Sequence, residues 1–166
     1  MDDVADGRLR GVLIVEALRP DAELVDLDIV VSSIRRTELE STAPGQPPTW
    51  TLIDFEADER TAGSLAEAFA DALRLGPWYV DFRSARTTFV CFAGRVFSYA
   101  HGDGDARALA VEHGRAVGVP EEQLDWAAAR VPTVSADVGI GREQAPRGPE
   151  ELGAARRNGC PLLQRG

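Results

Sequence analysis

Apolar residues in the first third of the chain follow patterns that predict three β-strands. Gly11–Arg19 is mostly aliphatic, which is typical of a strand buried on both faces in the middle of a sheet. In Leu24–Arg35 apolar residues alternate with aspartates, which predicts one buried face and one partly wet face. Trp50–Glu56 predicts a third strand. Because these strands follow one another along the chain, we expect an antiparallel meander.

A second group of three strands, joined by two tight turns, is predicted between Trp78 and Tyr99, where the chain reads WYVDFR-SAR-TTFVCF-AG-RVFSY. The aromatic residues of this segment exceed what one face of a sheet needs, so part of the second face is expected to be covered as well. Alternate side chains of the first of these strands point to opposite faces, with Trp78, Val80 and Phe82 on one face and Tyr79, Asp81 and Arg83 on the other.

Helical signals stand between and after these groups. Ser64 followed by Glu67 predicts a capping box at the start of a first helix. Asp105 is expected to cap a second helix that runs to about Val117, and Pro120 to open a short third one. Together the elements predict an α+β fold: an antiparallel sheet of about six strands in the order βββ-α-βββ-αα, with the helices packed on one face.

Aromatic composition divides the chain into a domain and a tail. All 11 aromatic residues lie between Trp50 and Trp126, whereas the last 36 residues have none and hold 10 Gly and Pro. Such a segment cannot bury enough apolar area to offset the entropy of ordering it. We therefore expect a single α+β domain over residues 1–130 and a Gly/Pro/Arg-rich C-terminal tail over residues 131–166.

Charge narrows the range of partners. The chain has 18 Arg, no Lys and 27 acidic residues, which gives a net charge of −9. Residues 1–130 carry a net charge of −10, and residues 131–166 carry +1. Binding to a nucleic-acid backbone or an anionic membrane requires clustered basic residues, so both are disfavoured, and a basic protein partner is favoured. The two cysteines lie far apart and no signal peptide or membrane span is recognisable, which predicts a soluble cytoplasmic protein.

Candidate catalytic and metal-binding groups are few. Residues 101–112 resemble an EF-hand loop at positions 3, 5 and 12, but His101 and Ala106 stand where a ligand and a glycine are needed. His113, the other histidine, falls on the apolar face of the second helix, and Cys91 lies in an aromatic strand, so both are expected to serve packing. We predict no catalytic residue, metal or cofactor.

One constellation suggests a ligand-facing surface. A carboxylate beside guanidinium groups on a rigid sheet can hold a peptide or an acidic ligand through paired hydrogen bonds. The alternative is a cross-strand ion pair on a solvated or helix-covered face. The predicted binding residues are Tyr79, Asp81, Arg83, Arg86, Arg95 and His101.

Through the segments GPWYVDFRSARTTFVCFAGRVFSYAHGD and GVPEEQLDWA, the chain resembles a group of small acidic actinobacterial proteins of unassigned function. The resemblance covers roughly Gly11 to Trp126 and implies no activity, cofactor or site. In outline, the order of elements is also similar to the secretion-chaperone-like fold and to small immunity proteins, which are acidic binding modules; this likeness is one of architecture alone.

These observations favour a non-catalytic acidic protein-binding module, such as an immunity, chaperone or adaptor protein, that docks a basic partner. The alternative is a small enzyme or small-molecule-binding protein of specialised metabolism, with a pocket between sheet and helices near Tyr79, Asp81, Arg83 and His101. A homodimer, and a tail that itself acts as a recognition peptide, stay open.

Overall fold

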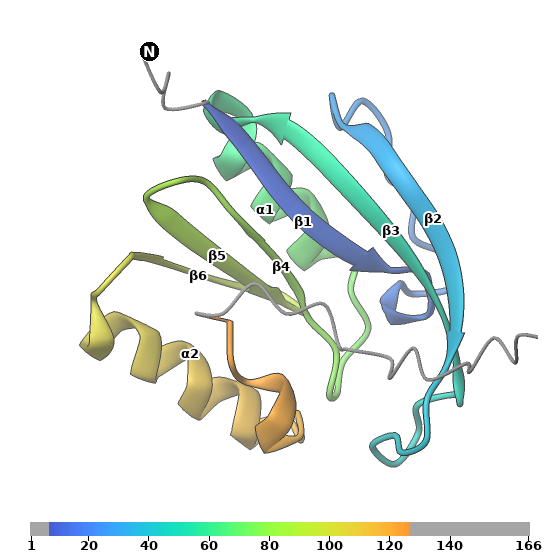
Figure 1. The fold of residues 1–166 in the computed structure, drawn as a ribbon. Coiled ribbons are helices and arrows are strands. Elements are labelled where there is room, and N and C mark those ends of the chain that lie inside the picture. Colours follow the sequence, from blue (N-terminus) through green and yellow to red (C-terminus); the bar gives the residue numbers. More distant parts are fainter. Residues whose placement is uncertain (1–6, 127–166) are drawn as a thin grey trace, which may run out of the picture. The chain divides into compact units, whose positions relative to one another are not determined.

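The computed structural model describes residues 7–126 (Figure 1). The chain divides into two units, Met1–Ser135 and Ala136–Gly166, and every described residue belongs to the first. The predicted domain end at residue 130 and the tail over 131–166 therefore lie outside the described residues.

The described part contains one antiparallel sheet of six strands in the spatial order β2-β3-β1-β4-β5-β6. This arrangement, with its two α-helices, confirms the α+β class. The strands are β1 (Arg8–Ile14), β2 (Val30–Glu38), β3 (Thr49–Asp58), β4 (Val80–Arg83), β5 (Thr87–Phe92) and β6 (Arg95–Ala100). The helices are α1 (Ala62–Ala72) and α2 (Gly104–Ala116), with single 3-10 turns η1 (Val15–Ala17), η2 (Glu59–Thr61) and η3 (Glu121–Gln123).

The first three strands do not form the expected meander. β1 lies between β3 and β4, and β2 pairs with β3 alone at the edge of the sheet. The connection between β1 and β2 is long, so β2 can pair with the far edge of β3 instead of with β1. In this connection Asp26 and Asp28 adopt φ values of 52° and 50°, in the left-handed region, so the extended strand begins only at Val30.

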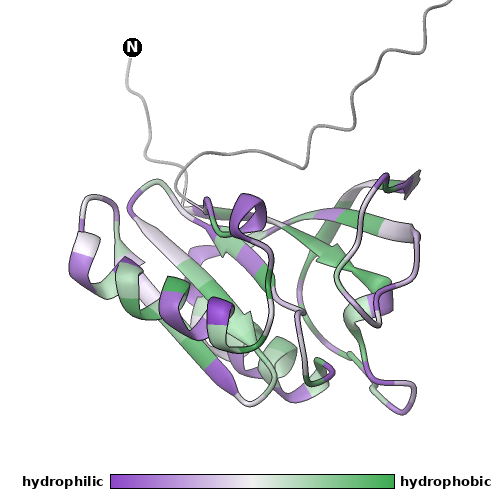
Figure 2. Cartoon of the chain, turned by 90° about the horizontal axis from the view of Figure 1, so that it is seen from below, coloured by the Kyte–Doolittle hydropathy of each residue, from purple (hydrophilic) through white to green (hydrophobic). Residues whose placement is uncertain are grey.

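Each helix covers its own side of β5 rather than sharing one face of the sheet with the other helix (Figure 1). The side that holds Cys91, here named the α1 face, belongs to the core that α1 completes. The side that holds Val90 and Phe92, here named the α2 face, packs against α2 and against Val119, Leu124 and Trp126, which flank η3. Since Val90, Cys91 and Phe92 are all buried, both faces of β5 require a cover. In Figure 2 hydrophilic and hydrophobic stretches alternate along α2, as expected for a helix with one covered side.

Two helix starts differ from those predicted. α1 begins at Ala62, so Ser64 lies inside it, and the Ser64 hydroxyl donates to the carbonyl of Thr61 at 3.0 Å instead of accepting a backbone N–H. α2 is capped by Asp103, whose carboxylate accepts from the N–H of Ala106 at 3.0 Å. At α1 the turn η2, whose start Asp58 caps, leads directly into the helix, and no side chain caps Ala62 itself. At α2 two aspartates compete for the first turn, and the sequence pattern does not say which one caps it.

The core on the α1 face is tightly packed around Gly11. The ring of Phe69 from α1 lies 5.5 Å from that of Phe55 on β3 and 6.1 Å from that of Phe82 on β4. A Cβ atom on Gly11 would lie 2.5 Å from the Cβ of Phe82 and 2.8 Å from the backbone oxygen of Asp81. The glycine in the middle of β1 is therefore a requirement of close packing.

Candidate functional site

Asp81 and Arg83 of β4, and Tyr79 just before it, lie on the α2 face, and Tyr79 is part of the packing of this face. The Tyr79 hydroxyl donates to the carbonyl of Gln123 at 3.1 Å. Its ring centre lies 5.5 Å from that of Trp126 and 6.2 Å from that of Phe92. Burial, and to a smaller extent the charge of Asp81, raise the pKa of Tyr79. Tyr79 thus fastens η3 and Trp126 to the sheet.

Asp81 is a carboxyl group on this face whose pKa is shifted far from its ordinary value. It is half-buried and lies between Val12 of β1 and Val90 of β5 in the sheet register. Burial raises its pKa to about 6, and the charge of Arg83 opposes this shift. Arg83, also half-buried, lies next to Arg10 of β1. Tyr79, Asp81 and Arg83 therefore lie on one face of the sheet, opposite to Val80 and Phe82, as the alternation predicted.

The remaining predicted residues lie at opposite ends of β6. At one end the backbone carbonyl of Arg86 accepts the N–H of His101 at 2.8 Å, and both residues are exposed. At the other end the guanidinium of Arg95 lies 5.1 Å from the centre of the Phe97 ring. The six predicted residues therefore form three separate groups, and their role in binding stays a prediction.

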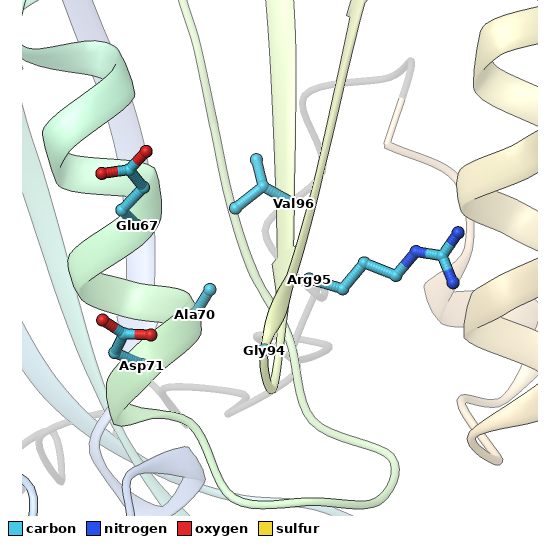
Figure 3. A pocket seen from close by; sticks show the side chains of 6 residues that line it. All are labelled: Glu67, Ala70, Asp71, Gly94, Arg95 and Val96. Atoms are coloured by element: carbon cyan, nitrogen blue, oxygen red, sulfur yellow. The ribbon is translucent and has the colours of Figure 1, made fainter.

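A hollow of about 270 Å³ lies between α1 and the β5–β6 turn. Figure 3 shows the carboxylates of Glu67 and Asp71 on the same side of this turn as Val96, whereas the guanidinium of Arg95 points away toward α2. Glu67 and Asp71 are both exposed and lie one helical turn apart. We name this feature the acidic hollow; it is lined by Glu67, Ala70, Asp71, Gly94, Arg95 and Val96.

A backbone hydrogen bond holds the two walls of the acidic hollow together. The N–H of Gly94 donates to the carbonyl of Ala70 at 2.9 Å. Ala70 lies in the last turn of α1, where carbonyl groups have no partner within the helix. Gly94 has a φ of 69°, in the left-handed region that favours glycine and that this tight turn requires. This hydrogen bond thus joins the β5–β6 turn directly to the last turn of α1.

The charges of the hollow are not neutralised within the described part of the chain. Residues 7–126 hold 12 Arg and 20 acidic residues, a net charge of −8. The ion pairs among them engage acidic groups such as Asp54, Glu56 and Glu121, but none involves Glu67 or Asp71. Two like charges four residues apart on a helix repel each other, so a cation between them would be favoured.

The sequence interpretation missed the acidic hollow. It gave Glu67 a capping role and did not single out Asp71 or Val96. A signal was available, because Glu67 and Asp71 stand four residues apart on the polar side of a predicted helix. The position of Val96 beside them depends on a contact between segments that are distant in sequence.

The other candidate groups serve packing. The ring of His113 lies 4.8 Å from that of Phe92 and 5.3 Å from that of Phe97, and burial, followed by the charge of Arg95, lowers the pKa of His113. Cys91 is buried, and burial followed by the charge of Asp81 raises the pKa of its thiol to about 12. A thiol with this pKa is not a nucleophile at neutral pH.

Residues 7–126 lack two kinds of feature. They contain no group of three or more His, Cys, Asp or Glu side chains placed to hold a metal ion. None of their helices combines the length and the apolar character that crossing a membrane demands.

Comparison of the chain with protein-family models, with curated proteins and with solved structures finds no match. The candidate site therefore rests on its own geometry.

Proposed function

We propose that this protein is a non-catalytic binding module whose acidic hollow receives a basic side chain of a protein partner. The observation that carries this proposal is the pair of exposed carboxylates of Glu67 and Asp71, which no arginine of the described residues neutralises. Ala70 and Val96 supply an apolar floor for the aliphatic part of an arginine or lysine side chain.

Charge acts at two ranges in this proposal. At contact, a guanidinium can donate to a carboxylate through two parallel hydrogen bonds, which favours arginine over lysine, whose ammonium group acts as a point charge. At longer range, the net charge of −8 on residues 7–126 attracts a basic partner and speeds encounter. Because both carboxylates are exposed, salt should weaken the complex measurably. We place the module in the cytoplasm, a location that the free thiol of Cys91 supports.

The experiment compares capture of partners by two variants with the same change in charge. The tagged protein, E67Q/D71N and the matched control E112Q/E122Q are used to capture proteins from an extract of the native cells at rising NaCl concentrations. Glu112 and Glu122 are exposed and lie on α2 and η3, away from the hollow. Partners lost with E67Q/D71N and kept with E112Q/E122Q support the proposal. Equal losses with both variants, or capture that does not weaken with salt, contradict it.

The alternative, a small-molecule-binding protein or enzyme, has one observation in its favour. Asp81 is a carboxyl group whose pKa of about 6 lets it hold a proton near neutrality. A library of small molecules screened by thermal shift against the protein and D81N would test this function. A compound that stabilises the protein and not D81N would favour it.

A further inference from the structure

β6 leaves half of its backbone groups free for another strand. Phe92 and Arg95 flank the two-residue turn and face each other, so Arg95, Phe97 and Tyr99 direct their N–H and C=O groups toward β5. The N–H of His101, next in this series, also points inward and donates to Arg86. Val96, Ser98 and Ala100 therefore direct their backbone groups outward, where only the carbonyl of Ala100 has a partner among the described residues, the N–H of Asp103.

The side chains of these outward residues leave the edge open. Val96, Ser98 and Ala100 are exposed, carry no charge and lie on the α1 face, since Val96 pairs with Cys91. Natural proteins protect edge strands with charged residues, prolines or bulges. β6 has none of these at its outward positions.

The opposite edge, β2, is protected in this way. Its pairing with β3 shifts register between Val31 and Ser33, which marks a bulge, and the hydroxyl of Ser32 donates to the carbonyl of Asp54 at 3.2 Å. Exposed Arg36 adds a charge to the same edge. Although β2 is the longer strand, it is the poorer template for another strand.

We propose that a basic segment of the partner binds in extended form as a seventh strand along β6 and places an arginine or lysine in the acidic hollow. Side chains of an added strand alternate between the two faces, so every second residue would lie on the α1 face beside Val96. There Glu67 and Asp71 supply the complementary charge. This inference rests on the proposed function and names its binding mode.

The test uses a defined probe, the acetylated and amidated peptide Thr-Val-Thr-Arg-Thr-Val-Thr, titrated into the isotopically labelled full-length protein and followed by NMR. We expect the largest shifts at the amides of Val96, Ser98 and Ala100. An added strand bonds β6 through one of its edges only. Two further peptides carry N-methyl groups, one at the odd-numbered residues and the other at the even-numbered residues. The peptide that has lost the N–H groups facing β6 should bind about tenfold more weakly, and the other should bind as the parent peptide does.

Two protein variants separate this inference from the proposed function. S98P removes an outward N–H without breaking a bond to β5, and S98A is its control. S98P should weaken peptide binding about tenfold relative to S98A, and E67Q/D71N should do so relative to E112Q/E122Q.

Each outcome has a distinct meaning. Equal binding by S98P and S98A, or by both N-methylated peptides, overturns strand addition; if E67Q/D71N still weakens binding, the acidic hollow keeps its proposed role. Unchanged binding by E67Q/D71N overturns that role as well. A dimer whose Val96 and Ser98 amides are protected from hydrogen exchange before peptide is added would assign the edge to a second copy and also overturn the proposal.

Discussion

The two faces of the sheet are packed differently, although both are covered by a helix. On the α1 face the core is apolar and aromatic, with the rings of Phe55, Phe69 and Phe82 in mutual contact. The α2 face mixes aromatic rings with polar groups: within residues 7–126 the buried Tyr99 hydroxyl, Arg107 Nε and Trp126 Nε1 have no hydrogen-bond partner of good geometry, whereas the α1 face has one such atom, Trp50 Nε1. We therefore expect the α1 face to contribute most of the stability, and the α2 face to carry more groups whose burial costs free energy.

The largest expected effect comes from the centre of the α1 face. F69A removes a side chain that is completely buried between two other phenylalanines, so it should lower the free energy of unfolding by about 3–5 kcal/mol in urea denaturation. F97A on the α2 face is the comparison. Phe97 is only half-buried, so its loss should cost about 1–2 kcal/mol. Equal costs would remove the distinction between the faces.

Close packing on the α1 face gives the next effect. G11A adds a methyl group that would lie 2.5 Å from the Cβ of Phe82 and 2.8 Å from a backbone oxygen, and neither can move freely. We expect a loss of about 2–3 kcal/mol in the free energy of unfolding. G63A is the matched control, because Gly63 lies in α1 with nothing within 4 Å of an added Cβ. That change should stabilise by roughly 0.5–1 kcal/mol, and similar losses in both variants would contradict the packing argument.

The α2 face predicts a gain in stability on mutation. The pKa of Asp81, raised to about 6 from 3.8 by burial, means that the folded state binds a proton more tightly than the unfolded state does. This stabilisation is complete below about pH 4 and is lost as the pH rises toward about 6. The full shift corresponds to about 3 kcal/mol, but solvent reaches the half-buried carboxylate and reduces this cost. D81N should therefore equal the wild type at pH 4 and exceed it by about 1–2 kcal/mol at pH 7.5.

Urea denaturation over pH 4–8 measures this difference, and D105N is the control for loss of an exposed carboxylate. A wild-type advantage over D81N at pH 7.5 would show that Asp81 makes a stabilising contact in its ionised form.

The difference between the faces also explains what could be predicted from the sequence. Strict alternation in β4 correctly separated Val80 and Phe82 from Tyr79 and Asp81, because in a strand the face of a side chain depends only on the parity of its position. The strands of the β4–β6 region and the end of α2 near Val117 were also predicted, since local turn residues determine them.

Features that depend on contacts between distant segments were not predictable in this way. The insertion of β1 between β3 and β4 depends on a connection whose path no local pattern determines. The acidic hollow depends on the approach of the β5–β6 turn to Asp71, fixed by the hydrogen bond from Gly94 to Ala70. Tyr79 was predicted to bind a ligand because it alternates with polar residues on one face of a strand. In the structure it instead packs under η3 and donates to the carbonyl of Gln123.

The smallest effect on stability is expected at an ion pair between β2 and β3, in a part of the sheet that α2 does not cover. Arg35 of β2 donates to Asp54 of β3 at 2.7 Å and 3.4 Å, on the side of the sheet opposite to Phe55. The Arg35 side chain is 38% exposed, so solvent screens the pair and R35M should lower the free energy of unfolding by only about 0.5 kcal/mol. Double-mutant analysis with D54N, in low and in 1 M salt, measures the coupling. A coupling near 3 kcal/mol that salt leaves unchanged would mean that the Arg35–Asp54 pair is shielded from solvent like a core group. The contrast between the two faces would then not extend to β2 and β3.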